Sequence, residues 1–470
     1  MKIRYLHESS PGIYFLDHKL TPEVRAMFAS MASRLPAGGI RARYAQVVDF
    51  VASELWTDFL GYAWEEAKKK DIPELNLKVL ETWYTSEDRL CEYPLHPRVQ
   101  NFFDEFVGKY GHSSIQEQTG EPAVYVEDSS WFTNWLMFDS PLVAGQEFST
   151  RAVQKKDWPM AREGRNSGEG ANLVSLHKDW MQLFELEANW WKDHLSDPKN
   201  REALGVGDKE PFRPALDRAR WALPGTISLG ACFTSNVRER ARVIRDASLL
   251  KEPQDIWSKV TDAYKEALPG ISVHAFREVS PEHQVPEHLQ KILCPVSGVE
   301  GLVDIRVSDQ NQDLAPVKSY VRKRVRTYED PWANHEKRTY LRIECSLAAA
   351  RDWHRHRTMY PWHLGVVLDA AGNLQLDRHY TPMSEEGKRT AQDLLQRSSE
   401  AFSMLYSAGD IQRAALALPL GSRVVVSGSG GYRDAKYMLE LRAFSHGANF
   451  EYRGQALEAL SQIDPNFSRK

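Results

Sequence analysis

The sequence predicts an α+β protein built from two related halves, and three observations carry that prediction. Residues 218–224 and 413–419 repeat each other at an offset of 195 positions, and both end in Leu-Pro. Apolar residues recur at helical spacing in several long segments, whereas two shorter segments alternate as strands do. At 470 residues, the chain also exceeds the size at which one core stops growing. We therefore expect one half over residues 1–272 and the other over 273–470.

Composition indicates a globular protein, with 42% hydrophobic and 26% charged residues. The formal net charge is −4, so any site for a polyanion must be a local basic cluster. The cysteines form no C-x-x-C pair, which favours a reducing compartment and predicts neither zinc nor any other metal site. They are Cys91, Cys232, Cys294 and Cys345. The start has no signal-peptide core and no run of about 18 apolar residues occurs, so we expect a cytoplasmic protein without a membrane partner.

The first half is expected to begin with a helical region over residues 1–110, on the apolar spacing through 45–51 and 99–107. Segment 122–136 is rich in aromatic and β-branched residues, which favours a strand or a transition from strand to helix. A further helix is predicted to begin with Ser175 as its cap. Two more helices are predicted over 237–250, ended by Pro253, and over 256–268, ended by Pro269-Gly270.

The second half begins with a mixed segment, 273–320, in which periodicity predicts little, followed by the basic run 321–326. Residues 339–345 alternate as a strand, and three alanines at 348–350 favour a helix that carries residues 353–357. Helices are also predicted over 384–408 and 432–443.

Four cationic or titratable residues stand together at His354-Arg355-His356-Arg357. On a helix consecutive side chains point in different directions, so at least one must enter the protein, and a buried cation needs an anion. Guanidinium groups bind phosphate and flavin carbonyl oxygens through paired planar donors. The cluster is therefore a candidate nucleotide site, and the alternative is a solvated basic helix end.

A second set of polar residues follows in Gln146-Glu147-Phe148-Ser149-Thr150-Arg151. In an extended segment, Glu147, Ser149 and Arg151 project to one side, where they could hold sugar hydroxyls and a phosphate. A surface loop has the same composition. The segment 111–117 likewise offers either ligand contacts or caps for a helix end.

Together these residues resemble the flavin-dependent thymidylate synthases. That family's signature reads Arg-His-Arg-x-x-Ser-x-Asn-x-x-Ser-x-Arg and follows a Gly-His-x-Ser-type segment. This chain carries Arg355-His356-Arg357 and, earlier, Gly111-His112-Ser113-Ser114. The resemblance covers about residues 98–272 and 321–462. It implies two tandem modules, each a twisted, mostly antiparallel sheet packed with helices.

Each half departs from the signature in a different part. The second half has Arg355-His356-Arg357, but its continuation lacks the family's Ser, Asn, Ser and Arg; those positions hold Tyr360, Trp362, Gly365 and Val367. The first half keeps the nucleotide-binding end, residues 146–151, but has Asp139-Ser140-Pro141 in place of Arg-His-Arg. Arg220 faces Ala415 across the repeat, and Arg442 faces Ala247. Because the losses are complementary, we expect one composite site shared by the halves and a second, decayed equivalent.

The resemblance implies transfer of a one-carbon unit to carbon five of a uracil nucleotide, dUMP to dTMP in type, with FAD as cofactor and NADPH and methylenetetrahydrofolate as co-substrates. Arg355, His356 and Arg357 would stabilise the developing negative charge and come nearest to catalysis. The implied FAD-binding residues are His112, Ser114, Glu117, Asn236, Arg238, Arg355, His356, Arg357, Arg433 and His446. The implied nucleotide-binding residues are Gln146, Glu147, Ser149, Arg151, Arg220 and Arg442.

Family active sites lie between subunits, so the resemblance also implies a homodimer that reproduces a four-copy assembly. Two alternatives are the same chemistry on another pyrimidine nucleotide, and a flavin- or nucleotide-binding protein without catalysis. A third is an RNA-binding module that uses 321–326 and the 14 tryptophans. The tryptophans lie mostly at core-like spacing, so we do not expect a nucleic-acid partner.

Overall fold

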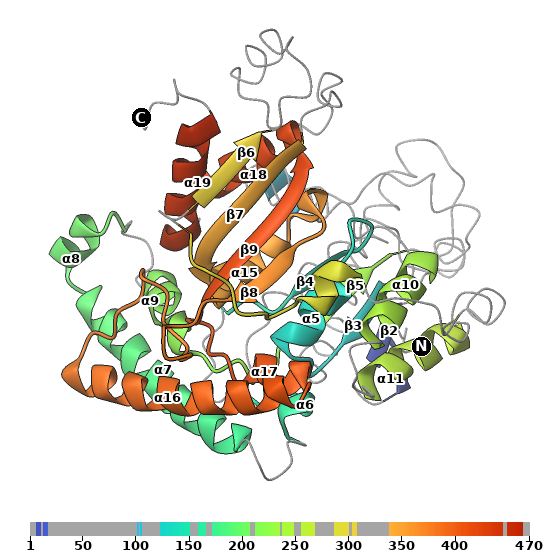
Figure 1. Ribbon diagram of the computed structural model, residues 1–470, viewed down its shortest axis with the longest axis horizontal. Helices are drawn as coiled ribbons and strands as arrows, with labels where there is room; N and C mark the ends of the chain where they lie inside the picture. Colours follow the sequence, from blue (N-terminus) through green and yellow to red (C-terminus); the bar gives the residue numbers. More distant parts are fainter. Residues whose placement is uncertain are drawn as a thin grey trace, which may run out of the picture.

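The computed structural model shows two antiparallel sheets with helices packed around them, which is the predicted α+β class. It describes residues 6–10, 13–16, 101–102, 104–105, 123–150, 158–165, 172–206, 212–235, 237–248, 255–267, 286–299, 303–307, 338–444 and 449–463. None of the helices in these ranges combines the length and the apolar content needed to cross a membrane. The four-stranded sheet lies above the long helix at the bottom of Figure 1, and the five-stranded sheet lies to its right.

The five-stranded sheet belongs to the first half and has the strand order β1-β2-β3-β5-β4. Its strands are β1 (Leu6–Ser10), β2 (Ile13–Leu16), β3 (Ala123–Val126), β4 (Ala144–Glu147) and β5 (Ala231–Thr234). The described side chains of β3 and β5 are buried almost completely. The predicted transition from strand to helix at 122–136 is confirmed, because β3 is followed directly by a helix.

The helical prediction for residues 1–110 is wrong at its start. β1 and β2 are an antiparallel pair, and β2 continues the pairing onto β3. The sequence between β1 and β2 is Pro11-Gly12, which favours a turn, and Tyr14 and Phe15 favour a strand. These local signals outweigh the helical spacing seen further along. Segment 45–51, on which much of the helical prediction rested, lies outside the described residues.

The helices of the first half agree with most of the predicted segments. They are α5 (Trp131–Met137), α6 (Arg162–Arg165), α7 (Leu173–His194), α8 (Pro198–Ala203), α9 (Phe212–Ala219), the 3-10 turn η5 (Arg220–Ala222), α10 (Val237–Ser248) and α11 (Asp255–Ala267). Ser175 is not the cap of α7, because Asn172 occupies that place and its side chain accepts from the Ser175 backbone N–H. Either side chain can cap a helix, so the sequence did not separate them.

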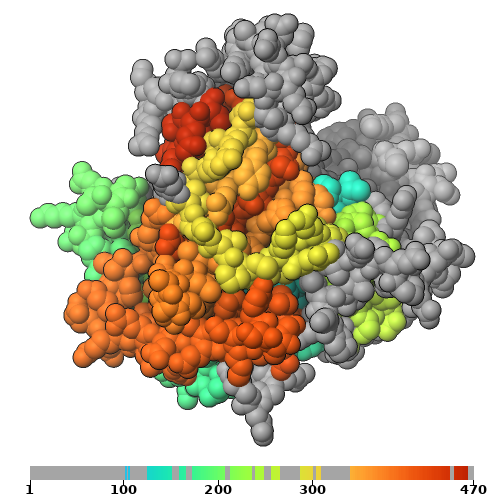
Figure 2. Space-filling model, viewed as in Figure 1, coloured from blue at the N-terminus to red at the C-terminus, as the bar shows by residue number. Residues whose placement is uncertain are grey.

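The second half contains the four-stranded sheet, with the order β6-β7-β9-β8. Its elements are α13 (Glu287–Gln290), β6 (Val303–Val307), β7 (Arg338–Ser346), α15 (Leu347–His354), η7 (Arg357–Met359), β8 (His363–Val366), α16 (Glu385–Ser407), α17 (Ile411–Leu416), β9 (Arg423–Gly431), α18 (Tyr432–Phe444) and α19 (Phe450–Ile463). The predicted strand at 339–345 and the predicted helices at 384–408 and 432–443 are confirmed. Figure 2 shows residues 286–299 and 303–307 in yellow at the surface of this face, beside the orange and red residues of 338–444.

The two halves use their elements in the same order. The strand order β2-β3-β5-β4 in the first sheet matches β6-β7-β9-β8 in the second, and β1 extends the first sheet at its edge. Helix α5 follows β3 as α15 follows β7, and α10 and α11 follow β5 as α18 and α19 follow β9. The predicted boundary between residues 272 and 273 lies outside the described residues and stays a prediction.

The halves meet at their two Leu-Pro turns. The backbone N–H of Leu420 donates to the carbonyl of Leu223 at 2.8 Å, and that of Gly421 donates to the carbonyl of Trp221 at 2.8 Å. On the other side of this contact, Gly225 lies so close to the carbonyl oxygen of Leu418 that a Cβ atom there would clash with it. The offset of 195 equates Leu223 with Leu418 and Gly225 with Leu420, so the contact is reciprocal. Such a contact is typical of a two-fold arrangement of related units.

The long helices α7 and α16, one from each half, also pack against each other. The Trp180 indole N–H donates to Ser398 Oγ at 3.0 Å in the buried part of this contact. Nearer the surface, Arg397 and Asp179 form an ion pair at 2.8 Å. The two halves therefore share one hydrophobic core.

Replacing Gly421 with alanine should weaken the contact between the halves. A Cβ atom there would lie 2.8 Å from both the Cβ atom and the carbonyl oxygen of Trp221, and neither can move without the backbone. We expect Gly421→Ala to lower the free energy of unfolding by about 1–3 kcal/mol, as overpacking does. Gly454→Ala is the matched control, because its Cβ would meet nothing within 4 Å and alanine favours the helix. Equal denaturant midpoints for Gly421→Ala and the parent protein would contradict the expectation.

Candidate functional site

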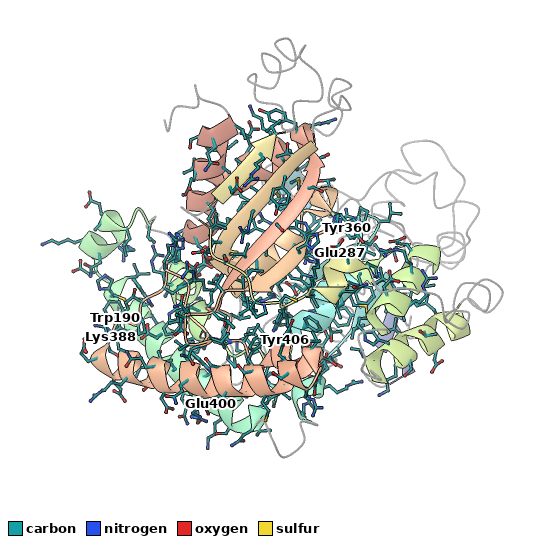
Figure 3. The ribbon with its side chains drawn as sticks, viewed as in Figure 1. Trp190, Glu287, Tyr360, Lys388, Glu400 and Tyr406 are labelled. Atoms are coloured by element: carbon teal, nitrogen blue, oxygen red, sulfur yellow. The ribbon has the colours of Figure 1, made fainter. Side chains whose placement is uncertain are left out.

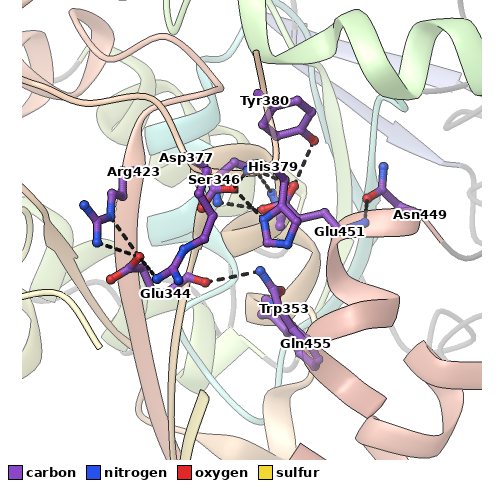
Figure 4. A network of polar contacts seen from close by, with 12 residues as sticks. Glu344, Ser346, Trp353, Asp377, His379, Tyr380, Arg423, Asn449, Glu451 and Gln455 are labelled. Atoms are coloured by element: carbon purple, nitrogen blue, oxygen red, sulfur yellow. Dashed lines mark hydrogen bonds and ion pairs between the residues drawn. The ribbon is translucent and has the colours of Figure 1, made fainter. Parts of the chain in front are cut away.

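Helix α15 fixes the position of the basic cluster at 354–357. Ser346 is its N-cap and accepts from the Ala349 backbone N–H at 3.1 Å. Glu451 holds Ser346 in turn, because its carboxylate accepts from the Ser346 backbone N–H and hydroxyl, both at 2.7 Å. Figure 4 shows this network, which also includes the Trp353–Gln455 hydrogen bond. Arg355 is the C-cap, so the cluster lies at a helix end, as predicted.

The two arginines of the signature reach across to the first half. Arg355 donates to the carbonyl of Gly145 in β4, and its guanidinium carbon lies 4.6 Å from the ring centroid of Phe138. Arg357 donates to the carbonyl of Pro141 at 3.0 Å. Residues of the second half that the sequence marked for anion binding therefore lie against the segment that carries Glu147.

Glu147 is already engaged by a residue that sequence reasoning missed. Its Oε1 accepts from Arg351 at 2.7 Å, and its Oε2 accepts from Asn134 at 3.2 Å. The Arg351 and Glu147 side chains are 7% and 13% exposed, so this is a nearly buried ion pair between the halves. Arg351 stands one helical turn before Arg355, outside the family signature, and only its place on the same face of α15 could have indicated it.

Arg220 and Arg442 approach the cluster from opposite sides. Arg220, which is 1% exposed, forms an ion pair with Asp352 at 3.3 Å. Burial opposes its charge, but Tyr380, Asp352 and other acidic groups outweigh burial and raise the pKa of Arg220. Arg442 donates to His356 Nε2 at 2.8 Å and to the Asp352 carbonyl at 2.7 Å. Both residues were predicted for nucleotide binding, and the fold brings both to α15.

The two histidines of the cluster are neutral, which corrects the interpretation of His356 as part of a cationic group. Burial, then the charges of Arg442 and Arg355, lower the pKa of His356 far below its usual range, and the ring accepts a hydrogen bond from Arg442. His354 is the residue that enters the protein. Burial, then Arg355, lowers its pKa to about 3, and the ring stacks on Trp135 at 3.8 Å between centroids. It therefore needs no anion.

Only some of the other predicted residues lie within the described ranges. Gln146 lies in β4 opposite Cys232, Ser149 follows that strand, and Arg433 lies in the first turn of α18. The side chain of Arg238 in α10 is not described. His112, Ser114, Glu117, Arg151, Asn236 and His446 lie outside the described residues, so their predicted contacts stay predictions.

The register of the two sheets shows what stands at the equivalent positions. Asp139 follows the N-cap Ser130 by the same number of residues as Arg355 follows the N-cap Ser346. Glu147 pairs with Ala231, and the offset of 195 carries that position to Val426, which pairs with Leu364. Aspartate thus replaces arginine in the first half, and leucine replaces glutamate in the second.

The equivalent place in the other half is occupied by a hydrogen-bonded aspartate–histidine pair. His288 Nε2 lies 2.6 Å from Asp139 Oδ2, and both side chains are buried. The His288 ring packs edge-on against Tyr360, which Figure 3 labels beside Glu287. Arg242 donates to the Asp139 carbonyl at 3.2 Å. Of the two related places, one gathers arginines and the other holds a matched aspartate–histidine pair.

No protein-family model and no curated protein matches this chain. Among solved structures, the UMP/dUMP methylase PolB from Streptomyces cacaoi, bound with 5-Br UMP, is similar to it over 37% of this chain and 93% of that chain. The two share 18% sequence identity, and the TM-score is 0.24.

Acid should destabilise the protein through His354. The imidazole titrates near 6.5 in the unfolded chain and near 3 in the folded one, so below about pH 6.5 only the unfolded state binds this proton. Stability should fall by up to about 1.4 kcal/mol per pH unit from this group as the pH drops. His354→Phe keeps a ring on Trp135 and should flatten the dependence, measured by denaturant unfolding between about pH 7.5 and pH 5.

The control is His194→Phe, because His194 stacks on Trp190 at 4.7 Å near the surface. It should leave the slope of stability against pH unchanged. If His354→Phe and the parent protein lose stability in parallel with falling pH, the buried neutral state of His354 is wrong.

Proposed function

We propose that the chain binds a pyrimidine nucleotide and FAD where α15 meets β4, and that it transfers a one-carbon unit to carbon five of the uracil ring. The observation that carries the proposal is the gathering of five guanidinium groups from both halves at this contact. They belong to Arg220, Arg351, Arg355, Arg357 and Arg442. Such a cluster suits phosphate better than any neutral ligand.

The partners of these arginines favour an anionic ligand. Glu147 and Asp352 face Arg351 and Arg220, whereas Arg355 and Arg442 donate to backbone carbonyls and to the neutral His356. Burial is the main cause that lowers the pKa of Arg355, and the positive charges of Arg442 and Arg351 lower it further. An added anion would relieve this repulsion. A hydrogen bond to a charged group also stabilises by about 1.5–3 kcal/mol, more than one between neutral partners.

The residues fit the phosphate groups of a nucleotide or of FAD. Nε of Arg220 and Nε of Arg351 are buried without a hydrogen-bond partner, so each has an N–H available to an acceptor oxygen. Arg355 and Arg357 would hold the flavin, and Arg220 with Glu147 would hold the nucleotide. When bound, reduced FAD supplies the hydride, with NADPH and methylenetetrahydrofolate as the co-substrates. The chain itself orients the ligands and supplies positive charge at a half-buried site.

The equal order of elements in the two halves supports a tandem duplication, with one composite site per chain. The reciprocal contact of the Leu-Pro turns supports the same arrangement. On this proposal the place built around Asp139 and His288 is the decayed equivalent. A homodimer would then complete a four-copy assembly, which sedimentation of the purified protein would test.

Removing one signature arginine should weaken flavin binding selectively. We expect Arg357→Ala to lower FAD affinity about tenfold or more, because a charged hydrogen-bond donor to phosphate is lost. Arg397→Ala in α16 is the matched control, since this arginine forms ion pairs with Asp179 and Asp393 instead. The measurement is the flavin absorbance retained after gel filtration, followed by titration with dUMP. Failure of the parent protein to retain FAD would overturn the flavin part of the proposal.

Glu147 should compete with any anion that enters the site. Its carboxylate neutralises Arg351 and also favours the charge of Arg355. We expect Glu147→Gln to raise the affinity for inorganic phosphate by up to about tenfold, because a negative charge a few ångströms away is removed. Glu163→Gln is the control, because the Glu163 carboxylate accepts a hydrogen bond from the Ser130 hydroxyl instead. Equal phosphate affinity in Glu147→Gln and the parent, measured by calorimetry, would show that phosphate binds elsewhere.

The Arg351–Glu147 pair also favours a second candidate, a nucleotide-binding protein without turnover. A glutamate held by both Arg351 and Asn134 has less freedom to bind a sugar hydroxyl. Incubation with dUMP, UMP, FAD, NADPH and methylenetetrahydrofolate, followed by product analysis, separates the candidates. Methylated product supports the enzyme, and a perturbed flavin spectrum without product supports the binding protein.

A further inference from the structure

Three side chains of metal-ligating type meet in the second half, away from the contact between α15 and β4. Asp377 and His379 lie in the connection between β8 and α16, and Glu451 lies in the first turn of α19. One ligand atom from each lies within 4.8 Å of the other two. Figure 4 shows the three side chains converging below Tyr380. Their sequence spacing matches no metal motif, and the fold alone brings them together.

The group places two carboxylates in the interior. Asp377 and Glu451 are both 0% exposed. Their ligand oxygens lie within 4.8 Å of each other, close enough for two negative charges to repel. Two buried carboxylates this close need positive charge beside them, and Arg220 of the first half supplies part of it at Glu451.

His379 supplies part of that balance. Its Nδ1 lies 2.7 Å from Asp377 Oδ1, and its backbone N–H donates to the same oxygen at 2.9 Å. The Glu451 carboxylate accepts from Ser346 and, at 2.8 Å, from the Tyr380 hydroxyl.

The Asp377 carboxylate nevertheless keeps one oxygen without a partner. Oδ2 is buried and accepts no hydrogen bond, although Oδ1 accepts two. A buried polar atom that forms no hydrogen bond is destabilising. A carboxylate oxygen left open beside an imidazole and a second carboxylate is the arrangement that a metal ion completes.

We propose that Asp377, His379 and Glu451 bind a divalent transition-metal ion of the Zn²⁺ type. One imidazole with carboxylate oxygens is a ligand set for zinc, whereas Mg²⁺ and Ca²⁺ prefer oxygen ligands throughout. Binding would displace the proton held between His379 and Asp377 and release it to solvent.

The ion would act on the arginine cluster through the helix that carries it. Glu451 holds Ser346, the N-cap of α15, and α15 carries Arg351 and Arg355. Fixing the Glu451 carboxylate therefore fixes the first turn of that helix. Neither Asp377 nor His379 contacts the arginines in any hydrogen bond of the described residues, so metal binding can be tested without a ligand or activity.

The test uses the full chain and Zn²⁺ itself. Protein stripped with a chelator is dialysed against a small excess of Zn²⁺, and the bound metal is counted by mass spectrometry. We expect one Zn²⁺ per chain and a higher thermal midpoint than in the stripped protein, since a ligand that binds only the folded state stabilises it. Stripped protein that binds less than a tenth of an equivalent, with an unchanged midpoint, would overturn the proposal.

The variants distinguish a built site from adventitious zinc. Asp377→Asn and Glu451→Gln preserve the shape of each side chain while removing its charge, and each should lower zinc affinity about tenfold or more. His288→Ala is the matched control, because His288 also forms a buried pair with an aspartate, at 2.6 Å, but belongs to no group of three metal-ligating side chains among the described residues. It should still bind one Zn²⁺. Zinc retained equally by Asp377→Asn and the parent, with both folded by circular dichroism, would place the ion elsewhere.

Discussion

The backbone hydrogen bonds between the two Leu-Pro turns hold the two halves in one register. Leu420 and Gly421 donate to Leu223 and Trp221, and a side chain at Gly421 would force the turns apart. Because the bonds join main chain to main chain, they fix the halves in one register. That register brings α15 of the second half against β4 of the first, and the ion pair between Arg351 and Glu147 can form only there.

A reciprocal contact of this kind creates two equivalent places, yet their chemistry differs. One collects guanidinium groups from both halves, and the other is closed by Asp139 and His288. In a symmetric dimer of identical chains, a change that removed arginine from one site would remove it from both. On the proposed tandem duplication, one chain is free of that constraint, so Asp139 can stand opposite Arg355, and Leu364 opposite Glu147, while the arginine cluster is kept.

The sequence predicted the elements whose signals are local and left out what depends on packing. The strand and helix around 339–357 could be predicted because alternation and then three alanines mark them, and the repeat at 218–224 indicated how the halves correspond. The neutral state of His356 could not be predicted from the sequence, since it follows from burial beside Arg442. The pairing of Arg351 with Glu147, and the group around Asp377, join residues far apart in the chain and have no sequence pattern at all.

The partners of Arg355 bear directly on the proposed binding of an anion. This guanidinium rests on the Phe138 ring and on the Gly145 carbonyl, both contributed by the first half. A cation–π contact of this kind stabilises by about 0.5–2 kcal/mol, whereas breaking a buried ion pair costs about 3–5 kcal/mol. An incoming phosphate would therefore exchange weak contacts for strong ones at Arg355, but would have to displace a carboxylate at Arg351 or Arg220. The first contact of a bound anion should accordingly be with Arg355, and Glu147 should leave Arg351 only after that contact has formed.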